Sequence, residues 1–456
     1  MSFGRRGFLR SLAAGGAACL AGCDAALAPF DAALDGGAPC PTLDPPRPPP
    51  ALDYPSADYF GTLAADLDAA GIGTPMVFLD MDRVDTNIDA IASAIPSPLS
   101  WRIVEKSLPS LDLLGYVSAR SGSDKLLVLH LPFLPALLGA LPDAEVLMGK
   151  THLTSAVAAF FDGLPAGTEL AAIARRTVFL ADGRSRLDEL IALAGRLGVR
   201  LRIAIEIDVG LRRSGLEDPS ELPPLLSAFL GSSAVELAGF LGYDGHVAFA
   251  PGGARAVDAA WSSATDAFQS FVGVLSEPEF ASLAALPGLI FHSGGSSTHP
   301  MYTSGTPVND VAAGGAVVRP GAYPDHVISA LRPAIFIATP VLRQLPNPRL
   351  PFFTAEQSAR LLEGRQGLTI YGGGWPAFFT HPADIQPAPL VSDPTDHVMV
   401  PNQGLVTAPA ELAIAPGDWI FYHPRQADAL FQFEAIHQVR AGHLHGDVMR
   451  PYPRRY

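Results

Sequence analysis

Lys106 is the residue with the clearest chemical potential in this sequence. The run 101–105 is expected to be a strand that ends at Lys106, because Ser-Leu-Pro at 107–109 breaks it. A lysine at the carboxyl end of a buried strand is poorly solvated, which favours the neutral amine that forms Schiff bases. The sequence has two other lysines, Lys125 and Lys150, so a Schiff-base enzyme would use one of these three. The alternative is that Lys106 is a solvated charge at a strand end.

Residues 1–23 have the pattern of an export signal. Arg5 and Arg6 precede an apolar, small-residue run to Leu20, which is the twin-arginine pattern and is too short to span a bilayer. The segment 20–23, Leu-Ala-Gly-Cys, resembles a lipobox in which Cys23 becomes the lipidated first residue. Ordinary cleavage without a lipid is the alternative. We therefore expect a periplasmic or cell-envelope lipoprotein, whose only membrane attachment is the lipid at Cys23.

Charge excludes several classes of partner. The formal net charge of the 456-residue chain is −14. Removing residues 1–22 takes away three arginines and no acidic residue, which leaves 28 basic against 45 acidic residues, a net charge of −17. Such an acidic protein is not expected to bind nucleic acid or an anionic membrane surface. The three cysteines all lie before residue 41, so the folded region holds no disulfide framework and no thiolate site.

The order of apolar runs favours a (β/α)8 barrel of the TIM type. Eight expected strands alternate with helical patterns at 110–119, 152–161, 185–198, 217–230 and 254–276. A doubly wound sheet is the alternative. The expected strands are 101–105, 125–130, 144–148, 177–181, 201–207, 235–241, 288–292 and 314–318.

After Arg332 the pattern changes to short strands punctuated by Gly, Pro, Asn and Asp, which indicates an antiparallel β domain. Its expected strands are 335–340, 368–371, 397–400, 419–422 and 430–433, and the run 74–80 before the barrel could pair with it. The sequence is thus divided into a signal with lipobox (1–23), a Pro- and Ala-rich tether (24–70), a barrel (71–332) and a C-terminal β domain (333–456).

Strand ends in such a barrel build the active site, so residues there are the candidates for chemistry. The seventh strand is followed by Gly294, Gly295 and Ser296, whose backbone and hydroxyl groups could converge on a phosphate. A lysine and a phosphate cup are what pyridoxal 5′-phosphate requires. A flexible turn is the alternative for this loop.

Three further candidates follow the fifth and sixth strands. Arg213 could direct its planar charge at a phenolate or carboxylate, or could be a surface residue paired with an acid. Tyr243 could pack beside a cofactor, and His246 could shuttle protons or be a satisfied structural histidine.

These motifs together resemble the D-threonine aldolase and D-serine dehydratase group, fold-type III pyridoxal-phosphate enzymes related to alanine racemase. The resemblance covers about residues 70–445 and rests on six short motifs in the same order: 74–80, 101–107, 208–215, 242–246, 294–297 and 319–321. It implies an alanine-racemase-like barrel with a β domain, a homodimer with sites closed by the partner, and Lys106 as the internal aldimine. It also implies Arg213, Tyr243, His246, Gly294, Gly295 and Ser296 as residues around the cofactor.

The sequence departs from the metal-dependent members of this group. They carry a His-x-Cys or His-x-Asp pair near the C-terminus, and here Arg425 and Ala427 stand at the matching positions. Neither a guanidinium nor a methyl group binds a divalent ion. A shifted register would use His423 and Asp428, but a metal is doubtful, and Arg425 could instead bind a substrate carboxylate.

The resulting expectation is a pyridoxal-phosphate lyase, an aldolase or a deaminating dehydratase, acting on a small amino acid of D configuration. Lys106, His246 and Arg213 are its expected catalytic residues. Racemisation is the alternative chemistry, because the cofactor and fold are shared. A non-catalytic lipoprotein that binds pyridoxal phosphate or an amino acid is the alternative of another class.

Overall fold

The computed structural model describes residues 52–323, 328–350, 353–388, 398–400 and 402–452. The expected signal, lipobox and most of the tether lie outside these residues. The proposed tether, 24–70, does not extend as far as expected. Its last part, Ala57–Ala69, forms helix α3, whose Phe60, Leu63 and Leu67 are buried. No helix among the described residues is long and apolar enough to cross a membrane.

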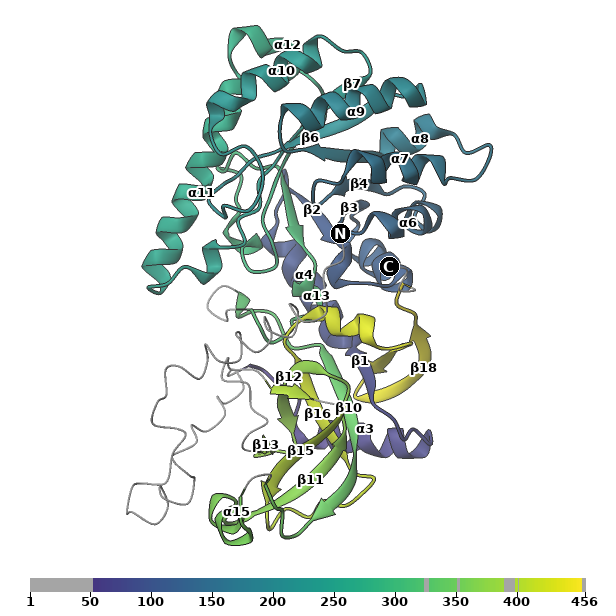
Figure 1. Ribbon diagram of the computed structural model, residues 1–456, viewed down its shortest axis with the longest axis vertical. Coiled ribbons are helices and arrows are strands. Elements are labelled where there is room, and N and C mark those ends of the chain that lie inside the picture. Colours follow the sequence, from purple (N-terminus) through teal and green to yellow (C-terminus); the bar gives the residue numbers. More distant parts are fainter. Residues whose placement is uncertain (1–51, 324–327, 351–352, 389–397, 401, 453–456) are drawn as a thin grey trace, which may run out of the picture. The chain divides into compact units, whose positions relative to one another are not determined.

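Eight parallel strands close into the expected barrel, with helices between them (Figure 1). Most strand residues are buried, as is usual where helices cover a parallel sheet. The strands are β2 (Ser100–Val104), β3 (Lys125–Val128), β4 (Glu145–Met148), β5 (Thr177–Ala181), β6 (Leu201–Glu206), β7 (Val235–Leu241), β8 (Ile290–Ser293) and β9 (Asp310–Ala313).

The helices of the barrel follow the apolar periodicity of the sequence. All five expected helical stretches are confirmed, as α5 (Leu111–Ser121), α7 (Thr154–Asp162), α9 (Arg184–Leu197), α10 (Leu222–Leu230) and α11 (Ala254–Leu275). The full set is α4 (Met81–Ala94), α5 (Leu111–Ser121), α6 (Leu134–Ala140), α7 (Thr154–Asp162), α8 (Leu170–Arg176), α9 (Arg184–Leu197), α10 (Leu222–Leu230), α11 (Ala254–Leu275), α12 (Ala281–Ala284) and α13 (Gly315–Val318). Gly122 and Gly198 end α5 and α9 in the left-handed conformation, with φ of 72° and 66°.

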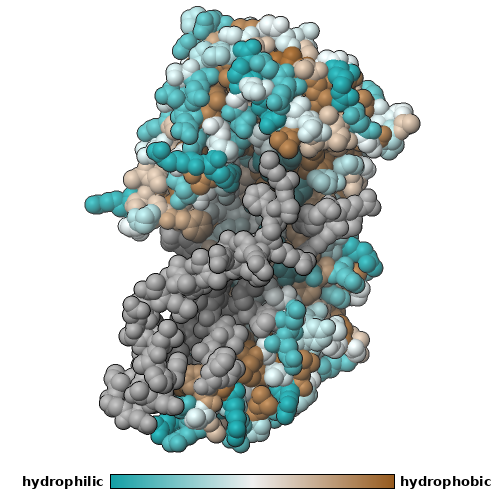
Figure 2. All heavy atoms as spheres, viewed as in Figure 1, coloured by the Kyte–Doolittle hydropathy of each residue, from teal (hydrophilic) through white to brown (hydrophobic). Residues whose placement is uncertain are grey.

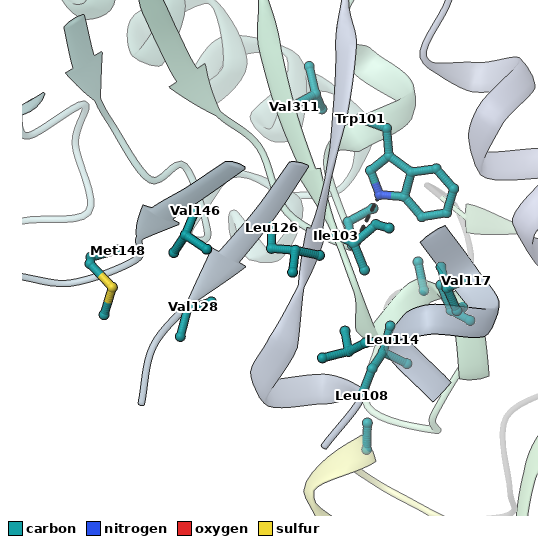
Figure 3. Packing of buried hydrophobic residues seen from close by; sticks show 14 of the residues in the cluster. Trp101, Ile103, Leu108, Leu114, Val117, Leu126, Val128, Val146, Met148 and Val311 are labelled. Atoms are coloured by element: carbon teal, nitrogen blue, oxygen red, sulfur yellow. Dashed lines mark hydrogen bonds between the residues drawn. The ribbon is translucent and has the colours of Figure 1, made fainter. Parts of the chain in front are cut away.

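The outer face of β2 shows how strands and helices are held together. Trp101 and Ile103 belong to one apolar cluster with Leu114 and Val117 of α5 (Figure 3). The indole N–H of Trp101 donates to the carbonyl of Ala313 at 2.9 Å, which fastens β2 to the neighbouring strand β9. This packing fixes the end of β2, from which Lys106 follows.

The eighth barrel strand was predicted wrongly. It is Asp310–Ala313, whereas most of the expected strand, Gly315–Val318, is the short helix α13. An apolar run of this length does not by itself distinguish a strand from a helix. The true strand begins with an aspartate, which apolar patterning does not select.

The antiparallel β domain is confirmed, and β1 (Met76–Asp80) joins it, as expected, by pairing with β10 (Ile335–Leu345) and β17 (Ile436–Arg440). The expected strand 430–433 is wrong, because Ala427–Gln432 forms a 3₁₀ helix that buries Ala427, Ala429 and Leu430. The other elements are α15 (Ala355–Leu361), β11 (Arg365–Tyr371), β12 (Trp375–His381), β13 (Gln386–Pro387), β14 (Val398–Val400), β15 (Gln403–Pro409), β16 (Trp419–Pro424) and β18 (His443–Met449).

Candidate active site

A pocket opens at the carboxyl ends of the barrel strands, where the sequence predicted the chemistry. Its empty space is about 760 Å³, a volume that includes the open solvent at its mouth. Its floor is apolar and includes Val104, Leu127 and Ala312 from inside the barrel. The polar side chains and glycines at its walls include Lys106, Ser107, Arg213, Tyr243, His292, Gly294, Gly295, Ser296, Ser297 and Tyr323.

Lys106 lies in a 3₁₀ turn, Glu105–Ser107, that directly follows β2. Glu105 is fully buried, and its Oε2 accepts from the backbone N–H of Leu129 at 3.3 Å. Because Glu105 turns inward, Lys106 turns outward and lines the pocket. The expected poor solvation of this lysine is wrong, since its side chain is exposed. Its chemistry must therefore come from its position at the pocket and not from burial.

The other two lysines are placed differently. Lys125 begins β3 at the amino end of the barrel, where its Nζ donates to Ser100 Oγ at 2.8 Å and lies 3.6 Å from Asp310 Oδ2. Lys150 is exposed and follows Gly149, which lines the pocket, but Lys150 itself is not among the pocket residues. Lys106 is thus the lysine that lines this pocket.

Arg213 and Tyr243 face each other across neighbouring loops. The guanidinium carbon of Arg213 lies 5.1 Å from the centre of the Tyr243 ring, which is within cation–π range. Burial and the neighbouring Asp244 raise the pKa of Tyr243, while Arg213 opposes the rise. The phenol therefore stays protonated at neutral pH and can donate a hydrogen bond.

His246 is not brought to the pocket. Its ring lies against Gly210, where a β-carbon would come within 3.0 Å of Nε2. Nδ1 is buried and has no hydrogen-bond partner among the described residues, and burial lowers the pKa of the imidazole. Lys106, Arg213 and Tyr243 therefore line one pocket. His246 is not among the residues that line it and packs against Gly210, in the loop that carries Arg213.

The glycine–serine loop after β8 borders the pocket through Gly294, Gly295, Ser296 and Ser297. Gly294 has φ of 85°, and a β-carbon there would meet Val311 and Tyr302 at 3.0 and 3.1 Å, so glycine is required. Ser296 Oγ accepts the backbone N–H groups of Gly314 and Ala316 at 3.3 and 3.0 Å. Ser296 thereby ties the loop after β8 to the segment after β9.

A buried hydrogen-bond network, which the sequence did not predict, supports this loop. Asp244 is fully buried and accepts hydrogen bonds from Thr298 Oγ1 and the Tyr302 hydroxyl, both at 2.9 Å. Thr298 Oγ1 also accepts from the N–H of Gly295 at 3.0 Å. Burial raises the pKa of Asp244 to about 6, and both hydroxyl donors oppose this. Thr298 and Tyr302 lie 54 and 58 positions after Asp244 in the chain, and no sequence signal connects residues so far apart.

Several other pocket residues also went unassigned, among them His292 and Tyr323. Both were visible in the sequence as residues at or after strand ends, but only the fold shows that their side chains border the pocket. Tyr323 hydrogen-bonds Ser296, and burial raises the pKa of this phenol to about 12. Hydrophilic and hydrophobic residues are interspersed on the part of the surface drawn in colour in Figure 2.

The positions that match the metal pair hold no cluster of ligands. His423 is fully buried; its Nε2 lies 2.8 Å from the carbonyl of Arg319 and its Nδ1 lies 2.9 Å from the Tyr54 hydroxyl. Both ring nitrogens are therefore engaged. Arg425 lies over the ring of Phe378 at 5.7 Å, and Ala427 is buried. The described residues contain no group of three or more side chains that could hold a metal ion.

Comparison with solved structures finds the same fold at low sequence identity. A D-threonine aldolase from Filomicrobium marinum and a D-threo-3-hydroxyaspartate dehydratase from Delftia sp. HT23 are each 16% identical, cover 83% of this chain and 96% and 97% of theirs, and have TM-scores of 0.59. An alanine racemase from Bacillus anthracis with bound L-Ala-P is 14% identical, with coverage of 83% and 98% and a TM-score of 0.58. No curated protein matches the sequence.

The chain also matches the profile of a protein family. The profile described as "Alanine racemase, N-terminal domain" matches residues 79–321, which is more than half of the chain and runs from β1 to the segment beyond β9. It spans Lys106, Arg213, Tyr243 and the glycine–serine loop. The chain therefore belongs to the alanine racemase N-terminal domain family.

Proposed function

We propose that this protein is a pyridoxal-phosphate-dependent lyase that acts on a small amino acid of D configuration, with Lys106 as the residue that holds the cofactor. The observation that carries this proposal is that Lys106 and the Gly294–Ser296 loop line one pocket. An amine and a phosphate site are the two groups that this cofactor needs.

The residues present fit the aldehyde and the phosphate of the cofactor by their place in the pocket. Lys106 Nζ would hold the aldehyde carbon, and the phosphate would lie against the loop of Gly294, Gly295 and Ser296, in which the Gly295 N–H donates to Thr298 Oγ1. The absence of a β-carbon at Gly295 leaves room for the Tyr243 ring, since a β-carbon there would lie 3.1 Å from Cε2 of Tyr243. When bound, pyridoxal phosphate supplies an electron sink that stabilises negative charge next to the α-carbon.

The chain's own residues then bind the substrate and handle protons. Arg213 would bind an anionic oxygen through its permanent charge, and Arg425 is a second candidate for the substrate carboxylate. Tyr243, whose phenol keeps its proton at neutral pH, would donate a hydrogen bond and would not act as a base. The amine of Lys106 lines the pocket, and it would carry the proton that moves during the reaction.

Two measurements test this function. The purified protein should show a visible absorbance band that borohydride removes, with the reduced pyridoxyl group on the peptide that contains Lys106. It should then convert D-threonine to glycine and acetaldehyde, or D-serine to pyruvate and ammonium. Failure to bind pyridoxal phosphate would overturn the proposal.

Racemisation is the second candidate, because an alanine racemase shares this fold over the same 83% of the chain. Incubation with D- and L-alanine separates the two functions. A racemase would form the opposite enantiomer without releasing an aldehyde or a 2-oxo acid, whereas a lyase would leave alanine unchanged.

We also propose that the protein is a homodimer exported by the twin-arginine route and anchored through a lipid on Cys23. The proposal is supported by the sequence pattern of residues 5–23 and by the family to which the chain belongs. Cys23→Ala should move the protein from the membrane fraction to the soluble fraction. Unchanged fractionation would refute the lipid anchor, and light scattering of the soluble variant would measure the oligomeric state.

A further inference from the structure

His292 occupies an unusual place between the pocket and the interior of the barrel. It is the third residue of β8, its side chain is only 3% exposed, and it borders the pocket that Lys106 also lines. Its Nδ1 lies 2.6 Å from Asp310 Oδ1, and Asp310 is itself 1% exposed. A histidine so deeply buried and paired requires a physical explanation beyond packing.

Charged neighbours keep the Asp310 carboxylate ionised. Arg102, which is fully buried, places Nε 2.7 Å from Asp310 Oδ1 and Nη2 2.9 Å from Oδ2. Lys125 Nζ lies 3.6 Å from Oδ2, and Glu145 takes a further hydrogen bond from Arg102 at 2.8 Å. These cations and the His292 hydrogen bond outweigh the effect of burial and hold the pKa of Asp310 far below its usual range.

The ionised carboxylate fixes the tautomer of His292. A carboxylate can only accept hydrogen bonds, so Nδ1 of His292 must carry the proton that joins the two residues. Burial, and to a lesser extent Arg102 and Lys125, lowers the pKa of His292 against the opposing effect of Asp310, so the ring is neutral at pH 7. A neutral imidazole with its proton on Nδ1 has a lone pair on Nε2. The Nδ1 edge faces Asp310, so the opposite edge is the one that borders the pocket.

We propose that His292 is a positioning residue that offers a hydrogen-bond acceptor of fixed orientation to the buried end of the pocket's ligand. The ligand would thus carry an N–H or O–H donor at that end. The inference rests on the proposed cofactor site, because the ring of pyridoxal phosphate carries a hydroxyl group and, when its pyridine nitrogen is protonated, an N–H, but it concerns a residue outside the expected set. Arg102 and Asp310 act through His292 and have no contact with the ligand in this proposal.

The tautomer can be measured without the cofactor. Protein labelled with ¹⁵N-histidine and freed of cofactor should give ring nitrogen signals for His292 with the proton on Nδ1, assigned by their loss in His292→Gln. Asp310→Asn, if it folds, should move the proton to Nε2, because an amide can donate to Nδ1. A proton on Nε2 in the wild-type protein would overturn the proposal.

Cofactor binding provides the second measurement. His292→Phe keeps an aromatic ring at this position and removes the acceptor, so the dissociation constant for pyridoxal phosphate should rise about tenfold, as one lost hydrogen bond predicts. His381→Phe, in β12 of the β domain, is the matched control and should bind as wild type does. Equal affinity of His292→Phe and wild type would refute the positioning role. If wild type itself fails to bind pyridoxal phosphate, the proposed function fails, and the tautomer still decides whether His292 offers the acceptor.

Discussion

The Tyr243 ring and Gly245 approach each other so closely that a β-carbon at position 245 would lie 2.4 Å from Cε1 of the ring. The other edge of the ring faces Gly295, where a β-carbon would lie 3.1 Å from Cε2. The two glycines therefore leave a narrow slot for the aromatic side chain that borders the pocket. Glycine at 245 is required by this close approach and not by its backbone conformation, since Gly245 is not in the left-handed region.

Gly245→Ala should displace the Tyr243 ring and weaken the binding of pyridoxal phosphate. Overpacking of this kind costs roughly 1–3 kcal/mol, so we expect the dissociation constant to rise about tenfold or more. Gly61→Ala in α3 is the control, since a β-carbon there meets nothing within 4 Å and should leave binding unchanged. Titration of both variants by fluorescence measures the effect, and wild-type affinity in Gly245→Ala would contradict it.

Lys106→Ala should abolish the visible absorbance of the bound cofactor and turnover together. The fold should persist, because the side chain is exposed and its removal leaves no core cavity. Circular dichroism and a thermal unfolding curve measure the fold in the same samples. A cofactor that remains covalently bound in this variant would show that another lysine is used.

Lys150→Ala is the matched variant, because Lys150 is the other lysine near the carboxyl ends of the strands. It is expected to weaken binding at most, since Lys150 is not among the residues that line the pocket with Lys106. Borohydride reduction followed by peptide mapping distinguishes the two. A pyridoxyl group on Lys150 would overturn the arrangement proposed around Lys106.

Much of the barrel was predictable, because buried strands and amphipathic helices leave periodic apolar patterns. What the sequence did not reveal is mostly polar and buried. Asp310 begins the true eighth strand because Arg102 pairs with it inside the barrel, and this pairing across 208 residues leaves no local pattern. The apolar run from Gly315 to Val318 was therefore predicted to be the strand, and this prediction was wrong.

The candidate site was predictable where a residue's role follows from its place at a strand end. Lys106, Arg213 and Tyr243 come from three different strand ends and meet at one pocket because a barrel brings these ends together. The solvation of Lys106 was not predictable, since it depends on the inward turn of Glu105. The placement of His246 depends in the same way on its packing against Gly210.

Activity should survive exhaustive chelation. Arg425 and Ala427 cannot bind a divalent ion, and both nitrogens of His423 are engaged by Arg319 and Tyr54. Turnover measured before and after dialysis against a chelator, with and without added manganese or zinc, checks this. Loss of turnover that manganese or zinc restores would show that a metal site was misplaced.

His423 should also make the stability of the protein depend on pH in a defined direction. Burial lowers its pKa to about 3, whereas an unfolded histidine has a pKa of about 6.5. The unfolded state therefore binds the proton first, so the stability contributed by neutral His423 is complete above about pH 6.5 and is lost as the pH falls towards 3. Between pH 7 and pH 5 this loss amounts to about 2 kcal/mol of the free energy of unfolding.

His423→Gln tests this dependence, because glutamine can donate to the Arg319 carbonyl and accept from the Tyr54 hydroxyl but does not titrate. The variant should be less stable than wild type at pH 7, since its amide cannot match the ring geometry. Its free energy of unfolding should nevertheless fall by about 2 kcal/mol less than that of wild type between pH 7 and pH 5. Urea unfolding of both proteins at the two pH values measures the difference. Equal losses would mean that His423 is already protonated in the folded protein, in which case its ring could not accept the hydrogen bond from Tyr54.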